Sequence, residues 1–98
     1  MKFYDLSVLV VEEDGSRRGK IRECLENIGL RRKPTHPIGN PENYLKIHGI
    51  EYDFLIAREK PDFSLGKTTY IQAPEDNAAS YAFFESKVIK IFSEYKKL

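Results

Sequence analysis

The fold is decided by the stretch "SVLVVEE", residues 7–13, and by the residues that follow it. Val8 to Val11 is continuously apolar and mostly β-branched. Continuous rather than alternating apolarity predicts a parallel strand that is covered on both faces. Asp14 to Ser16 supply N-cap chemistry, and the pattern predicts a helix to about Ile28, ended by Gly29. The chain therefore opens with a strand and a helix.

More strand and helix patterns follow along the chain. "DFLIA" (53–57) and "TTYIQAP" (68–74) predict strands. Any strand in the proline-crowded "LRRKPTHPIGNPEN" (30–43) is expected to be short and to lie at a sheet edge. "GNPENYLKIHG" (39–49) and residues 75–98 predict helices, the last with one apolar face. Strands that alternate with helices predict an α/β fold with a parallel sheet and helices on both of its faces.

Composition narrows the class of protein. The 98 residues carry 16 Lys and Arg against 15 Asp and Glu, so the whole-chain charge of +1 gives little reason to expect nucleic-acid binding. No apolar run reaches the length of a membrane span, so we expect no membrane partner. The only cysteine, Cys24, excludes an internal disulfide and fits a cytoplasmic location. It falls in a helical pattern that predicts a core position rather than a reactive thiol.

Three segments, taken together, resemble the receiver domains of two-component response regulators. "VLVVEEDGSRRGKIRECLENIGL" is similar to the receiver opening, an apolar strand that ends in two acids before a helix. "YDFLIAREKPDFSLG" is similar to the third strand and its loop, and "YIQAPED" to the last strand. The resemblance covers nearly the whole chain, although about one strand–helix unit is missing before the last strand.

The resemblance places the family's phosphorylation site on residues that have lost its chemistry. The metal-binding acid pair falls on Glu12 and Glu13, and the phosphate-accepting Asp falls on Arg58. The phosphate-binding Lys falls on Ala73, and only its following Pro survives, as Pro74. Arginine stays protonated and cannot act as the nucleophile. These positions imply a degenerate phosphorylation site with no catalysis, no metal and no cofactor.

Fold and function follow from the resemblance as expectations. We expect residues 1–98 to form a single receiver-like domain, doubly wound and flavodoxin-like, with about four parallel strands in the order 2-1-3-4. The expected function is a non-enzymatic signalling or scaffolding module, a cytoplasmic pseudo-receiver that binds proteins without phosphorylation. Its expected partners are a sensor kinase, a response regulator, a regulatory assembly, or a second copy in a homodimer.

Arg58 raises a specific hypothesis, because it follows a buried strand at the end where ligands gather. We hypothesise that its guanidinium takes the place of the magnesium ion and binds the carboxylate of Glu12, of Glu13, or of both. The alternative is that Arg58 points into solvent beside Glu59 and Lys60. A further alternative is an active receiver in which another acid, such as Glu59 or Asp62, accepts the phosphoryl group.

Two surfaces are predicted for binding partners. The protein-binding surface is expected at Tyr70, Phe83 and Ile89, on the last strand and helix, with isolated surface apolar residues as the alternative. A basic patch would serve a different function, that of a small nucleic-acid-associated regulator. Its residues are Arg17, Arg18, Arg31, Arg32 and Lys33. The alternative is an ordinary solvated surface whose charges are balanced by neighbouring acids.

Overall fold

The structure is a computed structural model that describes residues 6–37, 41–48 and 51–96. The described residues form three parallel strands, β1 (Val8–Val11), β2 (Phe54–Ala57) and β3 (Thr69–Gln72). They also form the helices α1 (Gly15–Asn27), α2 (Pro41–His48) and α3 (Ala78–Lys96). The fold is therefore α/β, as the sequence predicts.

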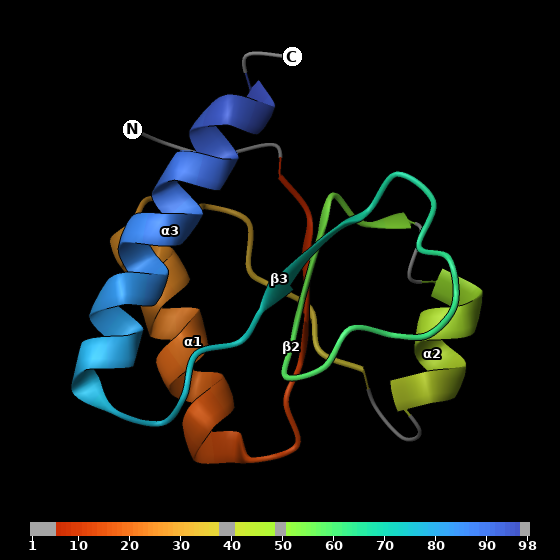
Figure 1. Ribbon diagram of the computed structural model, residues 1–98, viewed down its shortest axis with the longest axis horizontal. Coiled ribbons are helices and arrows are strands. Elements are labelled where there is room, and N and C mark those ends of the chain that lie inside the picture. Colours follow the sequence, from red (N-terminus) through yellow and green to blue (C-terminus); the bar gives the residue numbers. More distant parts are fainter. Residues whose placement is uncertain (1–5, 38–40, 49–50, 97–98) are drawn as a thin grey trace.

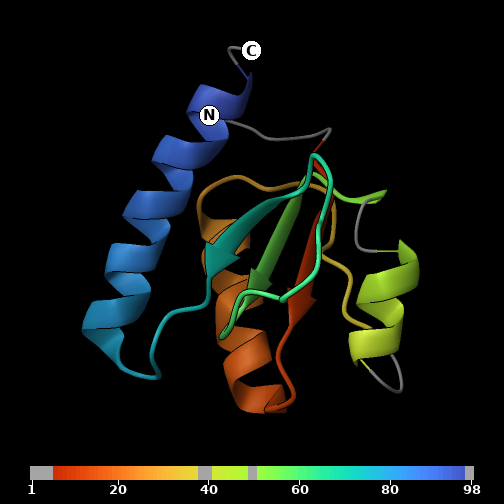
Figure 2. The same ribbon diagram turned by 45° about the vertical axis from the view of Figure 1, so that its right-hand side comes forward.

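The sheet lies between two helical layers (Figures 1 and 2). Its strand order is β1-β2-β3, so β2 is the central strand. Helices α1 and α3 lie side by side on one face, and α2 lies on the other. All four residues of β2 are buried, as are the first three of β1. This burial is the physical reason why both strands are continuously apolar.

Alternate residues of the strands pack into two separate cores. The larger core, under α1 and α3, joins one face of the sheet to aromatic and aliphatic helix residues, among them Val10, Ile56, Ile21, Val88 and Phe92. The smaller core lies under α2 and the loop between β2 and β3. Its buried residues are Leu9, Leu45, Leu55, Ala57 and Leu65. Cys24 belongs to the larger core, and burial with two nearby glutamates raises its pKa to about 11.

Both ends of α1 are closed by hydrogen bonds that the sequence predicts. The carboxylate of Asp14 accepts hydrogen bonds from the backbone N–H groups of Ser16 and Arg17, so Asp14 is the N-cap. Gly29 has φ 101°, and the N–H of Leu30 donates to the carbonyl of Leu25 at 3.0 Å. This Schellman geometry requires the left-handed backbone that glycine adopts at no steric cost.

The expected fourth strand is not confirmed among the residues that the structure describes. In the described chain between α1 and α2, Thr35 forms an isolated parallel bridge with Leu9, on the side of β1 away from β2. Val10 donates to the carbonyl of Thr35 at 2.8 Å, and Thr35 donates to the carbonyl of Val8 at 3.0 Å. Prolines next to this bridge cannot extend a ladder, so the pairing stops there. The predicted order of four strands is thus not confirmed.

The other helix predictions are confirmed in position. The chain forms α2 within the predicted 39–49, whose outermost residues 39, 40 and 49 lie outside the described residues. The carboxamide oxygen of Asn77 accepts the N–H of Ser80 at 2.8 Å and so caps α3. The neighbouring Asp76 accepts hydrogen bonds from the Tyr81 hydroxyl and the Lys20 ammonium.

We predict that two isoleucines on helices differ sharply in their contribution to stability. Ile21 is fully buried beneath α1, whereas Ile47 on α2 is 67% exposed. Ile21→Ala should lower the free energy of unfolding by about 2–5 kcal/mol, because it removes buried methylenes and leaves a cavity. Ile47→Ala, the matched control, should change it by less than about 0.5 kcal/mol. Urea denaturation followed by circular dichroism measures both, and equal effects would contradict the packing described above.

Candidate functional site

The carboxylate of Glu12 lies at the carboxyl end of β1, and its side chain is only 1% exposed. Val11 and Ala57 are register partners, so the next residues, Glu12 and Arg58, are neighbours. Arg58 Nε donates to Oε1 and Nη2 to Oε2, each at 2.8 Å. Such bidentate pairing is the strong geometry for a guanidinium on a carboxylate. The hypothesised ion pair is therefore present, and it is made with Glu12, while Glu13 is exposed.

Arg17 is a second cation of this crevice. Its Nε lies 3.4 Å from Oε1 of Glu12, and its Nη2 donates to the carbonyl of Pro74 at 2.6 Å. The side chain is only 15% exposed, so Arg17 does not belong to an exposed basic patch. Arg17 thus connects the tip of β1 with the chain just after β3. The signal for this role was its position in the first turn of α1, immediately after the strand tip.

Backbone groups complete the surroundings of the Glu12 residue. The N–H of Asp14 donates to Oε2 at 3.1 Å, and Arg18 Nη1 donates to the Glu12 carbonyl at 2.9 Å. Burial raises the pKa of the Glu12 carboxyl, but the hydrogen bonds and the two arginine charges outweigh it and lower the pKa below its usual 4.5. The same pairing raises the pKa of Arg58. Both groups are therefore charged at neutral pH.

The five positions of the degenerate phosphorylation site gather at one end of the sheet. Glu12 and Glu13 follow β1, Arg58 follows β2, and Ala73 and Pro74 follow β3. Ala73 packs against the larger core and offers only a methyl group, so it has no means of binding a phosphoryl group. Pro74 is buried and contributes its carbonyl to Arg17.

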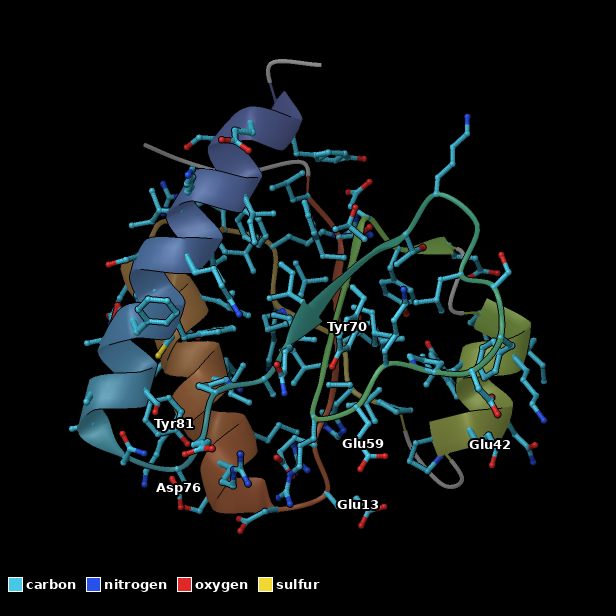
Figure 3. The ribbon with its side chains drawn as sticks, in the orientation of Figure 1. Glu13, Glu42, Glu59, Tyr70, Asp76 and Tyr81 are labelled. Carbon is cyan, nitrogen blue, oxygen red and sulfur yellow. The ribbon has the colours of Figure 1, made fainter. Side chains whose placement is uncertain are left out.

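An open cavity of ≈ 570 Å³ lies beside the ion pair, at the ends of β1 and β2. Its floor includes Val11, Leu45 and Ala57. Acidic side chains dominate its rim, and Figure 3 shows those of Glu13 and Glu59 at the same end of the molecule. The acidic residues that line the cavity are Glu12, Glu13, Glu42, Glu59 and Asp62. An anion such as a phosphoryl group would be repelled by this rim.

The residues of the crevice do not fit the magnesium ion that receivers hold. Both oxygens of Glu12 already accept hydrogen bonds from Arg58, and Arg17 adds a second positive charge at 3.4 Å. Two guanidinium groups repel a dication, and magnesium needs several oxygen ligands in near-octahedral order. Within the described residues, no three His, Cys, Asp or Glu side chains gather as metal ligands. A guanidinium thus lies where the resemblance would place the metal.

The three residues of the predicted protein-binding surface do not form one surface. Tyr70 packs in the smaller core, and its hydroxyl donates to the carbonyl of Ala57 at 2.9 Å. Phe83 is 70% exposed and lines a cavity of ≈ 340 Å³ beside the end of β3. Ile89, 42% exposed, comes six residues later, about 240° around the helix axis. Phe83 therefore lies on the β3 side of α3, and Ile89 on a different flank.

The remaining basic residues lie on the first turn of α1 and on the chain after this helix. Arg31, Arg32 and Lys33 are exposed, and Arg18 is half-buried. Arg18 and Lys33 line a cavity of ≈ 270 Å³ between α1 and the segment that carries Thr35. Arg17 of the predicted patch thus lies in the Glu12 crevice, whereas Arg18 and Lys33 line this second cavity.

No protein-family model, curated protein or solved structure matches this chain. The resemblance to receiver domains therefore rests on the residues quoted above and on their order. Among the residues that the structure describes, no helix has the length and apolar character to cross a bilayer.

We predict that the Glu12 carboxylate stabilises the fold only above acidic pH. Because its pKa is lower in the folded state than its usual 4.5, its contribution is fully present above that value and is lost as the pH falls through the folded-state pKa. Glu12→Gln should lower the free energy of unfolding at pH 7 by about 1–2 kcal/mol, since charge-assisted hydrogen bonds are lost to a partly solvated partner. The deficit relative to wild type should shrink below about pH 4.

Urea titrations at several pH values measure this deficit. Glu13→Gln, which removes the adjacent exposed carboxylate, is the matched control and should change stability by less than about 0.5 kcal/mol. A Glu12→Gln deficit that stayed constant with pH would show that the charge of Glu12 has no part in stability.

Proposed function

We propose that this chain is a phosphorylation-independent pseudo-receiver, a non-enzymatic signalling or scaffolding module that acts by binding proteins. The observation that carries the proposal is the bidentate pair between Arg58 and Glu12. It fills the place where the resemblance expects the acceptor and its metal. Because the Arg58 side chain is 53% exposed, the pair adds only modest stability, and its proposed role is to hold the crevice in one permanent conformation.

The receiver-type arrangement of four strands in the order 2-1-3-4 is part of the proposal. The parallel bridge at Thr35, on the outer side of β1, supports it as the remnant of a strand at that edge. The proposed setting is two-component signalling in the cytoplasm. A sensor kinase, a response regulator or a regulatory assembly would be the partner, or a second copy of the chain.

The outer edge of β3 is the surface that we propose for binding. The N–H groups of Thr69 and Ala73 donate to carbonyls on the β2 side at 3.0 and 2.8 Å. In a parallel ladder the intervening Tyr70 and Gln72 therefore direct their N–H and C=O groups outward. In the described chain β3 has no neighbour on that side. Open edges of this kind pair with added strands, and exposed Phe83 lies beside this one.

The edge is self-complementary for a homodimer. If two copies pair their β3 strands antiparallel around a two-fold axis at Ile71, Tyr70 lies opposite Gln72 of the other copy and both exchange hydrogen bonds. The same register places exposed Lys67 opposite exposed Glu75. Opposite charges across the strands favour this register over its neighbours.

We predict that the chain does not accept a phosphoryl group. After incubation with acetyl phosphate and magnesium chloride, its intact mass should be unchanged, because Arg58 replaces the nucleophile and acidic residues surround the cavity. A receiver with an intact acceptor serves as the positive control. A stable phosphoryl adduct, above all on Glu59 or Asp62, would refute the proposal. Calorimetric titration with magnesium, expected to show no binding, provides a second readout.

We predict that Phe83→Glu weakens self-association while Ile89→Glu does not. Both changes place a carboxylate on an exposed apolar position of α3, but only Phe83 lies beside β3. Sedimentation velocity of the wild type over a range of concentrations should show a monomer–dimer equilibrium that Phe83→Glu shifts towards monomer. Circular dichroism checks that both variants fold. A monomeric wild type, or equal effects of the two variants, would rule out the β3 homodimer.

A further inference from the structure

A cavity of ≈ 270 Å³ lies between α1 and the chain segment that follows it, and it shares no lining residue with the acidic cavity beside the ion pair. One wall is the helix, from Gly15 to Arg22, and the other is the segment 33–36. Val10 of β1 lies at its base and is buried. The lining thus joins a strand, a helix and an irregular segment that are distant in the sequence.

The polar lining of this cavity is basic. The side chains that can carry positive charge are Arg18, Arg22, Lys33 and His36. No aspartate or glutamate is among the lining residues that the structure describes. The acidic cavity of ≈ 570 Å³ shows that charge is unevenly distributed over a chain whose net charge is only +1. Positive side chains that converge on a concave site raise the local concentration of anions.

The donors of the cavity are available to a ligand. Arg18 uses Nη1 to hold the Glu12 carbonyl, but a guanidinium has five N–H donors. Arg22 pairs with Glu26 at 3.0 Å, and both of these side chains are about half exposed. Such a surface pair contributes little and exchanges readily with another anion. Lys33 and His36 are exposed at the opposite wall.

The walls are fixed before any ligand binds. Thr35 is tied to β1 by two backbone hydrogen bonds, of 2.8 and 3.0 Å. The helix is held from beneath by the buried side chains of Ile21 and Leu25. Pro34 restricts the segment between Lys33 and Thr35. A site with such fixed walls loses little entropy when it binds, which favours even a small ligand.

We infer that this cavity binds the phosphate group of a small phosphorylated ligand. Arginine and lysine are the side chains that recognise phosphate, by bidentate hydrogen bonds and by charge. The volume is just below the range of about 300–1,000 Å³ for ordinary small-molecule sites. It therefore suits a phosphate with a small attachment rather than a whole nucleotide cofactor. The site is separate from the β3 edge, so it does not depend on the proposed function.

A small ligand is favoured over nucleic acid by the shape of the site. The basic residues line a compact cavity, whereas single-stranded nucleic acid needs an extended groove with aromatic side chains for base stacking. No aromatic residue other than His36 is among the described residues that line the cavity.

Substitutions at Gly19, which lines the cavity, test whether it binds phosphate. A Cβ atom added there would meet nothing within 4 Å, and glutamate and glutamine are both good helix formers, so both variants should fold. Gly19→Glu adds a negative charge beside the cavity and should abolish phosphate binding. Gly19→Gln adds the same bulk without charge and should retain most of it. Lys33→Gln should weaken binding about tenfold through loss of one charged hydrogen bond, and Lys67→Gln, remote from the cavity, should not.

Binding is measured by amide chemical shifts of ¹⁵N-labelled protein, at constant ionic strength, with inorganic phosphate and with glycerol phosphate as probes. We expect saturable shifts at Gly15, Gly19 and Thr35 at millimolar probe concentrations. Tighter binding of glycerol phosphate than of free phosphate would identify a monoester as the ligand class, and the reverse would identify the free anion.

Three outcomes would overturn the inference. The first is the absence of saturable shifts, and the second is equal binding by Gly19→Glu and Gly19→Gln. The third is a single-stranded RNA oligonucleotide that binds more tightly than either probe and shifts Arg31 and Arg32 more than Gly19. That result would assign the basic residues to a nucleic-acid surface.

Discussion

The buried carboxylate of Glu12 is the constraint on which the functional end of this molecule depends. A charge in the protein interior must be paired and hydrogen-bonded, because its desolvation is otherwise costly. Arg58, Arg17 and the N–H of Asp14 meet this requirement; Arg58 follows β2, whereas Asp14 and Arg17 belong to the start of α1. Through Arg17 and Pro74 the network also reaches the end of β3. One charged group thus holds together the carboxyl ends of all three strands and the first turn of α1.

This network shapes the crevice at the strand ends. Arg58 and Arg17 surround the Glu12 carboxylate there, beside an open cavity of ≈ 570 Å³. The surfaces that we propose for recognition lie elsewhere, at the outer edge of β3 with Phe83 and at the basic cavity beside α1. A fold of this class usually binds its ligands at the strand ends. Here a permanent ion pair occupies that position.

Sequence patterns that act within a few residues predicted the structure better than patterns that depend on distant parts of the chain. Local signals such as the Asp14 cap, the Gly29 stop and the continuously apolar strands act within a few residues, and the structure confirms them. The strand around Thr35 is not confirmed in the described chain, where prolines flank a single bridge. Tyr70, Phe83 and Ile89, predicted as one surface, lie on different sides of the described fold. Helical phase and the choice of sheet face separate residues that a linear pattern places together.

The sequence by itself determined the α/β class, the parallel strands β1 and β2, and the position of Arg58 at a strand end, because hydrophobic periodicity and caps are local properties. The tertiary structure alone decided that Arg58 pairs with Glu12 rather than Glu13. In a strand, successive side chains point to opposite sides, and the register of β1 with β2 sets which of them meets the guanidinium. Only the tertiary structure shows that Arg17 lies in the crevice and not in the predicted basic patch. The packing of α1 on the sheet sets the direction in which its first turn points.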